Sequence, residues 1–126
     1  MNLLLDTDTL IYFFRGHKVV RSLLQQNHRF HYSYVTRKEL LRKKGLSDRE
    51  RKSIEALLGR IRQIPIDGKI ASLAEKLLKQ YKQRGLQVAD SLIAASAVSW
   101  KCQLVTFNTR HYRFIDGLVL YSHQET

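Results

Sequence analysis

Short apolar runs separated by longer amphipathic stretches make up most of this chain. Four of the runs have the length and composition of buried strands, and they cover residues 3–5, 30–35, 103–107 and 118–121. A weaker run at residues 64–66 contains Pro65, which has no backbone N–H to donate to a neighbouring strand. The pattern therefore predicts four strands and a fifth candidate at the edge of the sheet.

Apolar positions between these runs recur at the spacing of helices. Residues 54, 57, 58 and 61 are apolar at positions i, i+3, i+4 and i+7, and the same spacing runs from Ile70 to Tyr81. Gly85 follows Arg84 and is typical of a helix end. An alanine-rich helix is expected over residues 88–100, and a short one in "TDTLIYFF" after the first strand.

Strands that are apolar throughout and alternate with helices are typical of a parallel sheet covered on both faces. We therefore expect an α/β fold of three layers, with a central, mostly parallel sheet of four to five strands flanked by helices. The 126 residues, 44% of them hydrophobic, are enough for one core, so we expect a single domain over residues 1–126.

The single cysteine, Cys102, permits neither a disulfide within the chain nor a thiolate cluster for zinc. This fits a reducing compartment, and we expect a cytoplasmic protein. The apolar start carries Asp6 and Asp8 and has no basic leader, so we expect neither a signal peptide nor a membrane span.

The charge balance narrows the class of partner. Lys and Arg number 22 against 11 acids, which gives a net charge of +11. Such a field attracts polyanions, and nucleic acid is the first candidate. A generic solubilising surface or an acidic protein partner are the alternatives.

Polar side chains stand where two of the predicted strands end. Asp6 follows the first strand, and Asn108 ends "LVTFN". Ligands of parallel α/β sheets bind at the carboxyl ends of strands, so these two residues are candidates for one site if the strands are neighbours. Asp6 or Asp8 can instead cap the helix that follows, and the strand-end position favours Asp6 as the functional acid.

Glu39 and Asp90 are two further candidate acids. A structural role explains Glu39 more readily than it explains Asp90. Thr36 and Glu39 match a T-x-x-E capping box, so the local sequence alone favours a structural role for Glu39. The same pattern recurs at Ser47 and Glu50. Asp90, in "LQVADSLIAASAV", has apolar neighbours at helical spacing and no basic residue to pair with. An unpaired carboxylate on an apolar face is costly, which favours a functional role for Asp90.

Two families begin with an aspartate at the end of a buried strand. Asp6, Asp8 and Thr9 resemble the opening of haloacid dehalogenase-type phosphatases, and "LVTFN" resembles their second motif. That family also needs a late pair of acids with a GDxxxD-like spacing, and the late acids of this chain do not have it. Motif matches this short are weak on their own.

A broader resemblance covers residues 1 to about 121. The segments "LLLDTDTLIYFF", "TRKELLRKKG", "VADSLIAASAV" and "LVTFNTRHYRFIDGLVL" occur in that order. Together they resemble a PIN domain, and specifically the small toxins of VapC type. The resemblance implies a PIN-like parallel sheet flanked by helices and a Mg²⁺- or Mn²⁺-dependent endoribonuclease that leaves a 5′-phosphate and a 3′-hydroxyl.

The resemblance also implies roles for individual residues. By position, Asp6, Glu39 and Asp90 match the three catalytic acids, and the fourth position falls on Asn108, where many members have aspartate. We expect Asp6 and Asp90 to contact the metal and Glu39 to orient or deprotonate the attacking water. We expect Asn108, which is neutral, to hydrogen-bond there and to leave a second ion weakly held.

Partners follow from the same resemblance and from the charge pattern. It implies an RNA substrate, an antitoxin whose tail blocks the site, and a homodimer. The densest basic stretch, residues 37–52, adjoins Glu39, and we expect it to contact RNA phosphates. The residues expected to do so are Arg37, Lys38, Arg42, Lys43 and Lys44. A solvated helix pair is the alternative for this stretch, and a nucleic-acid-binding module without turnover is the alternative for the whole chain.

Overall fold

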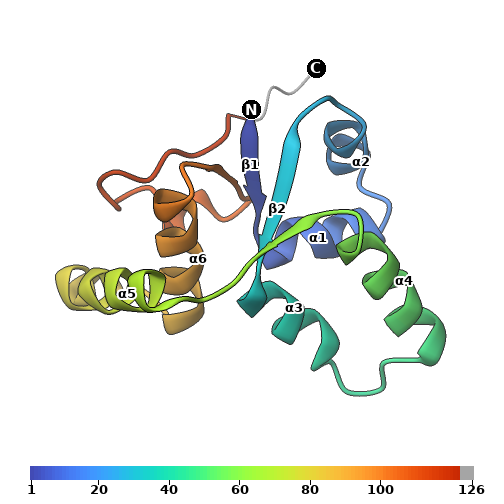
Figure 1. Cartoon of the computed structure of the whole chain (residues 1–126), viewed down its shortest axis with the longest axis horizontal. Coiled ribbons are helices and arrows are strands. Elements are labelled where there is room, and N and C mark those ends of the chain that lie inside the picture. Colours follow the sequence, from blue (N-terminus) through green and yellow to red (C-terminus); the bar gives the residue numbers. More distant parts are fainter. Residues whose placement is uncertain (123–126) are drawn as a thin grey trace.

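The computed structural model describes residues 1–122, and its centre is a sheet of four strands. The strands are β1 (Asn2–Leu5), β2 (Arg29–Ser33), β3 (Arg62–Ile64) and β4 (Gln103–Val105). They lie in the order β3-β2-β1-β4, and all three pairings are parallel. The predicted α/β class with a parallel sheet of four to five strands is therefore confirmed (Figure 1).

Six α-helices and two short 3₁₀ turns connect the described strands. The helices are α1 (Thr7–Phe14), α2 (Lys18–Leu24), α3 (Tyr34–Leu41), α4 (Asp48–Leu58), α5 (Gly68–Gln80) and α6 (Val88–Ser99). The 3₁₀ turns are η1 (Lys82–Arg84) and η2 (Thr109–His111). No helix within residues 1–122 combines the length and the apolar character needed to cross a membrane.

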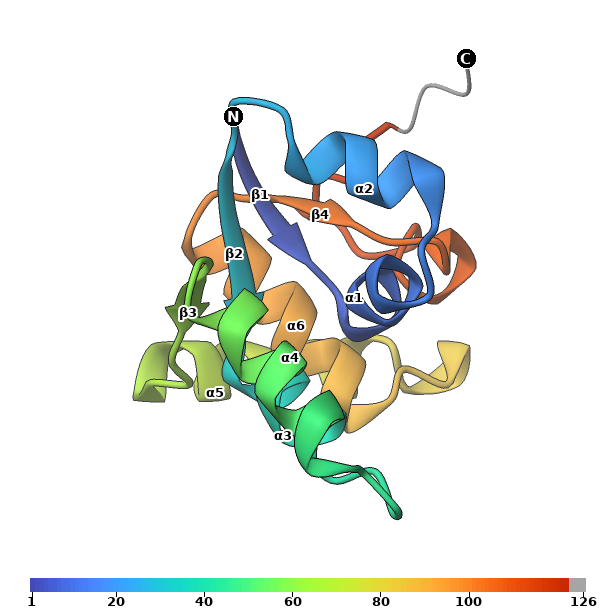
Figure 2. The ribbon, with the colours of Figure 1, turned by 90° about the vertical axis from the view of Figure 1, so that its right-hand side faces the viewer.

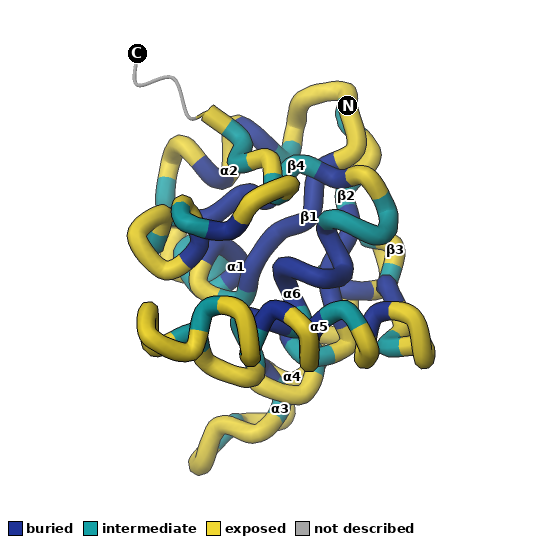
Figure 3. Tube along the Cα trace, turned by 90° about the vertical axis from the view of Figure 1, so that its left-hand side faces the viewer, coloured by how far each residue is buried: buried dark blue, intermediate teal, exposed yellow. Residues whose placement is uncertain are grey.

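Two hydrophobic clusters lie on opposite faces of the sheet, and β1 contributes to both. Leu4 packs with residues of α5 and α6, whereas Leu3 and Leu5 pack with residues of α1 to α4. All three leucines are fully buried, as expected for alternate side chains of an inner strand covered on both sides. Figure 3 shows β1 and most of α6 buried behind α5, and Figure 2 looks onto the opposite layer of α1, α2 and α4.

Four of the five predicted strands differ in where they end or how they pair. β4 ends at Val105 rather than at residue 107. β2 ends at Ser33 rather than at residue 35, because the Ser33 hydroxyl accepts a hydrogen bond from the Val35 backbone N–H (3.1 Å) and caps α3. β3 ends at Ile64, directly before Pro65, and it lies at the predicted edge of the sheet. Residues 118–121 form only a single parallel bridge, Leu104 to Leu120, beside β4.

Some of the helix predictions are confirmed and others are wrong. Ser47 and Glu50 do form a capping box at the start of α4. The predicted helix end at Gly85 is wrong for α5, which ends at Gln80; Gly85, whose φ of +72° suits glycine, instead ends the η1 turn that follows. The Thr36–Glu39 capping box is wrong, because α3 begins at Tyr34 and Thr36 lies inside it. The sequence pattern did not predict α2, whose N-cap residue His17 makes no side-chain capping bond.

Candidate metal site and adjoining groove

A cavity of about 360 Å³ opens where β1 and β4 end, and we call it the acid cavity. Its lining residues are Asp6, Thr7, Asp8, Ile11, Glu39, Asp90, Ile93, Asn108, His111 and Tyr112. β1 and β4 pair in parallel with Leu5 opposite Val105, so the residues that follow both strands meet at one edge. The structure thus brings the four predicted site residues, Asp6, Glu39, Asp90 and Asn108, to one cavity, and their catalytic roles stay a prediction.

Asp6 is the deepest acid of the cavity, with only 3% of its surface exposed. Its Oδ1 accepts a hydrogen bond from the Thr9 backbone N–H (2.8 Å), so Asp6 caps α1 as well as lining the cavity. The sequence analysis treated the helix cap and the functional acid as alternatives, but Asp6 is both. Burial raises the pKa of Asp6 above its ordinary value, although hydrogen bonds from Thr106 and Thr9 oppose the rise.

Asp90 lies in the first turn of α6 and receives two polar side chains from the segment around η2. The Tyr112 hydroxyl donates to Asp90 Oδ1 (3.0 Å), and His111 Nδ1 lies 3.6 Å from Asp90 Oδ2. Burial and the negative charge of Asp90 raise the pKa of Tyr112 far above its ordinary value, so this phenol remains a donor. The absence of a basic partner at helical spacing was read correctly, but the contacts of Asp90 come from elsewhere in the chain.

Glu39 reaches the cavity from α3 and is held by α1. The Thr7 hydroxyl donates to Glu39 Oε1 (2.6 Å), and the Thr7 and Thr36 hydroxyl oxygens lie 3.0 Å apart. Thr36 is fully buried, whereas Glu39 is exposed. Glu39 therefore belongs to α3 and is hydrogen-bonded by Thr7 of α1 at the mouth of the cavity. It is not part of a helix cap.

Sequence reasoning gave three titratable cavity residues no role in the PIN-like site. Asp8, considered as a helix cap and as part of the phosphatase-like motif, accepts a hydrogen bond from the Asn108 side-chain amide. His111 and Tyr112 contact Asp90, as described above. The sequence did contain an indication that Asp8 belongs to the site, because Asp8 follows Asp6 by two residues. For His111 and Tyr112 the indication was the "H-Y" pair that follows the β4 strand.

The donor chemistry of the acid cavity suits a hard divalent cation. Four carboxylates line it, and among the described residues no Lys or Arg does. Carboxylate oxygens are the ligands that Mg²⁺ and Mn²⁺ prefer. As the side chains stand, no group of three His, Cys, Asp or Glu within residues 1–122 is arranged to hold a metal ion. The acids therefore fit the ion by type, but not by their present arrangement.

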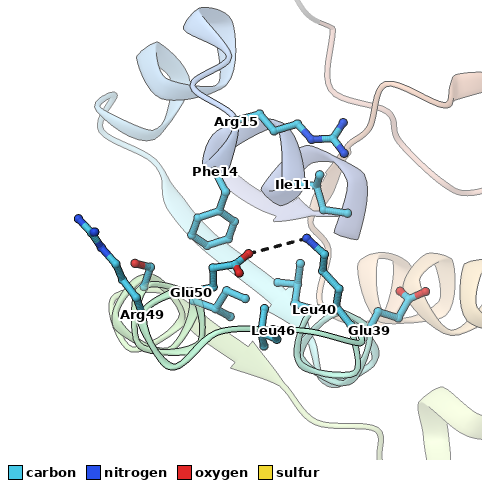
Figure 4. A pocket seen from close by; sticks show the side chains of 11 residues that line it. Ile11, Phe14, Arg15, Glu39, Leu40, Leu46, Arg49 and Glu50 are labelled. Carbon is cyan, nitrogen blue, oxygen red and sulfur yellow. Dashed lines mark ion pairs between the residues drawn. The ribbon is translucent and has the colours of Figure 1, made fainter.

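A larger hollow of about 670 Å³, the basic groove, lies between α1, α3 and α4 (Figure 4). Its lining residues are Ile11, Phe14, Arg15, Glu39, Leu40, Lys43, Leu46, Arg49, Glu50, Ser53 and Ile54. Ile11 and Glu39 line both the groove and the acid cavity, so the two hollows adjoin. Figure 4 shows Glu39 at one side of the groove, with its carboxylate turned away from Phe14 and Leu46.

The five residues expected to contact RNA are distributed unevenly around these hollows. Arg37 binds both carboxylate oxygens of Glu55 (2.8 and 3.0 Å), and Lys38 lies over the Tyr34 ring. Lys43 lines the groove and forms an ion pair with Glu50 (3.7 Å). Arg42 and Lys44 are exposed but line neither hollow. The groove also contains Arg49, which belongs to the predicted basic stretch of residues 37–52, and Arg15, which the sequence pattern did not single out.

Comparisons with known proteins agree on one family. The model of the PIN domain matches residues 3–116. A comparison with curated proteins finds no match.

Several solved structures share the fold over nearly the whole chain. VapBC-1 from nontypeable Haemophilus influenzae is 25% identical, with a TM-score of 0.82 over 96% of this chain and 97% of that one. A toxin–antitoxin complex from Klebsiella pneumoniae is 27% identical, with a TM-score of 0.78 over 93% and 95%. DNA-bound VapBC from Salmonella typhimurium is 23% identical, with a TM-score of 0.84 over 96% and 97%. The chain therefore resembles the PIN-domain toxins of VapBC toxin–antitoxin systems.

Proposed function

Since this chain belongs to the PIN domain family, whose members are generally nucleases, we propose that it is a VapC-type toxin that cleaves RNA with Mg²⁺ or Mn²⁺. The observation that carries the proposal is the acid cavity, where Asp6, Glu39 and Asp90 meet although they come from three different elements. The family match also sets aside the phosphatase alternative, which rested on a few motif residues only.

Asp6 and Asp90 would hold the cation, which when bound lowers the pKa of a water and offsets the charge that develops on the phosphate. Asp6 is fixed for this by its cap bond to Thr9, and Asp90 by the Tyr112 hydroxyl. Because burial disfavours the charge of Asp6, a cation in the cavity would also stabilise its ionised form.

Glu39 is the acid best placed to take a proton from the attacking water. It is exposed at the cavity mouth, and the Thr7 hydroxyl orients its Oε1. A carboxylate at the opening can accept a proton from the water and release it to solvent. Its Oε1 bond to Thr7 holds the side chain in place, so Oε2 would be the oxygen that takes the proton.

The repulsion between RNA and four carboxylates must be overcome by the surrounding cations. The net charge of +11 supplies long-range attraction, and Arg15, Lys43 and Arg49 stand around the groove next to Glu39. We propose that RNA phosphates bind along this groove. Contacts of this kind carry affinity rather than sequence choice.

The same groove is suited to an inhibitory protein partner. Its floor includes the apolar Phe14, Leu40 and Leu46, which would accept the apolar face of an antitoxin segment. A basic side chain of that segment could reach the acid cavity through Glu39 and pair with its carboxylates. The toxin–antitoxin complexes among the similar structures support such a partner, and a homodimer remains part of the proposal.

An RNase assay tests the proposal. The purified chain is incubated with labelled RNA in Mg²⁺, Mn²⁺ or EDTA, beside Asp90→Asn and Asp116→Asn. Asp116 is an exposed aspartate outside the acid cavity, which makes it a matched control. Cleavage that needs metal, is abolished in Asp90→Asn and survives in Asp116→Asn supports the enzyme.

The alternative is a PIN module that binds RNA without cleaving it. Two observations favour it: position 108 is a neutral asparagine, and the acids do not form a ready metal site. RNA binding without cleavage at every metal tried would support this module and contradict the nuclease.

A further inference from the structure

Asp8 and Asn108 face each other across the acid cavity although 100 residues separate them in the chain. Asp8 lies in the first turn of α1, and Asn108 directly precedes η2. The Asn108 amide nitrogen donates to Asp8 Oδ2. Only the nitrogen of the amide can face the carboxylate, because two oxygens at hydrogen-bond distance would repel.

The Asn108 side chain makes no capping bond at the start of η2. The backbone N–H of Asn108 binds Thr106 Oγ1 (3.0 Å), so the turn is fixed by the backbone and a neighbouring threonine. The local turn does not explain why the amide points at Asp8. The contact instead fixes the direction of the Asp8 carboxylate.

Asp8 lines the same cavity as Asp6 and Asp90, although its side chain is exposed. Its carboxylate therefore lies beside the space between the two proposed metal ligands, and Asp6 is only two residues away in the chain.

We propose that Asp8 is the fourth carboxylate of the metal-binding site and that Asn108 is the residue that positions it. This inference rests on the proposed function. It assigns the fourth negative charge of the site to Asp8 at the start of α1, rather than to position 108, where many family members have aspartate. The neutral residue at 108 then leaves the charge of the site undiminished. Because the Asn108 amide holds Oδ2 of the exposed Asp8 side chain, Oδ1 is the oxygen that would bind the cation.

A purely structural role for Asp8 makes a different prediction. An acid in the first turn of a helix stabilises the helix dipole, and Asp48 occupies the corresponding turn of α4. If that were the whole role, Asp8→Asn and Asp48→Asn would both lower stability slightly, and neither would change metal binding. Asp48 lines neither hollow, so Asp48→Asn is a matched control.

The test is titration of the intact chain with Mn²⁺, followed by the electron paramagnetic resonance signal of the free ion. The variants are Asp8→Asn, Asp48→Asn, Asp90→Asn and the exchange Asp8→Asn/Asn108→Asp. Circular dichroism confirms that each variant is folded. We expect Asp8→Asn to weaken Mn²⁺ binding about 10- to 100-fold, the range seen when a supporting group of a metal site is lost. Asp48→Asn should leave it unchanged, and the exchange should recover most of the loss, since it returns the charge to the opposite member of the same pair.

Three outcomes would overturn the inference. Mn²⁺ affinity in Asp8→Asn within about twofold of the unchanged chain, with binding lost in Asp90→Asn, would remove Asp8 from the site and leave the proposed function standing. An exchange variant no better than Asp8→Asn would refute the pairing with position 108. No Mn²⁺ binding by the unchanged chain would end the proposed function, and this inference with it.

Discussion

Tyr112 and Asp90, 22 residues apart, are joined by a hydrogen bond of 3.0 Å between the phenol and Oδ1. Tyr112 is 2% exposed, and burial keeps its hydroxyl protonated, so the bond links the core to the wall of the acid cavity. The contact gives a carboxylate on a largely apolar helix a fixed direction. It also makes Tyr112 a positioning residue for a proposed metal ligand.

Tyr112→Phe should therefore lower both stability and metal affinity. The ring stays in place, but Asp90 loses a donor, and hydrogen bonds to charged groups contribute about 1.5–3 kcal/mol. We expect the free energy of unfolding to fall by about 1–2 kcal/mol in urea, with Mn²⁺ bound less tightly. Tyr34→Phe, at an exposed tyrosine outside the cavity, is the control. Unchanged Mn²⁺ affinity in Tyr112→Phe would show that Asp90 does not depend on this bond for its function.

Asp6→Asn should make the metal-free protein more stable at neutral pH. Because burial raises the pKa of Asp6, the folded state binds its proton more tightly than the unfolded state does. The contribution of this group to stability therefore falls as pH rises from below the ordinary value of 3.8 through the raised folded pKa. Asparagine keeps the helix cap without the charge.

Urea unfolding in EDTA across this range checks the prediction. The advantage of Asp6→Asn over the unchanged chain should be present at pH 7 and vanish below pH 3.8, where Asp6 is protonated in both states. The same variant should be inactive on RNA. A variant that is less stable than the unchanged chain at pH 7 would mean that the buried charge is compensated by the protein itself.

Glu39→Gln should separate the catalytic and the structural roles of this residue. The amide can still accept the Thr7 hydrogen bond but cannot take a proton, and losing a general base typically costs about 10²–10⁴-fold in rate. We expect that loss in RNA cleavage with a change in stability of less than about 0.5 kcal/mol. Glu75→Gln on α5, an exposed glutamate outside both hollows, should change neither quantity. Lost stability with retained cleavage would return Glu39 to a structural role.

The basic groove should determine how RNA affinity depends on salt. In an Asp90→Asn background, which prevents cleavage, Arg15→Ala and Arg49→Ala should each weaken RNA binding. Each should also reduce the slope of log affinity against log salt by about 0.7, the value for one phosphate contact with a single strand. Lys79→Ala on α5, outside the groove, is the control. Equal losses in all three variants would indicate general charge attraction rather than a defined path.

Local signals in the sequence were sufficient for many of the elements. The leucines of β1, the Ser47–Glu50 capping box and the alanine-rich α6 each depend on neighbours along the chain, so their patterns are visible in the sequence. The predicted strand over residues 30–35 included Tyr34 and Val35, which begin α3, because their apolar character hid the helix cap at Ser33. The short α2 carries no side-chain cap, so no signal marked its beginning.

Two features allowed the candidate site to be predicted from the sequence: the ends of the strands and the positions of residues in the family motifs. Those signals identified Asp6, Asp90, Glu39 and Asn108, which do line one cavity. The bonds between them are non-local: Thr7 to Glu39 spans 32 residues, and Asn108 to Asp8 spans 100. Such contacts depend on how helices pack, and a single sequence does not record that. The capping-box interpretation of Glu39 failed for a local reason instead, because α3 already begins at Tyr34 and Thr36 lies inside it.

The most direct test of the account is a crystal structure of the chain grown with Mn²⁺ and measured for anomalous scattering. We expect a strong anomalous peak in the acid cavity, bound by carboxylate oxygens of Asp6 and Asp90 at about 2.0–2.3 Å. A cavity without a peak at saturating Mn²⁺, with Asp6 and Asp90 keeping the protein contacts described above, would contradict the proposal that these acids hold a catalytic cation.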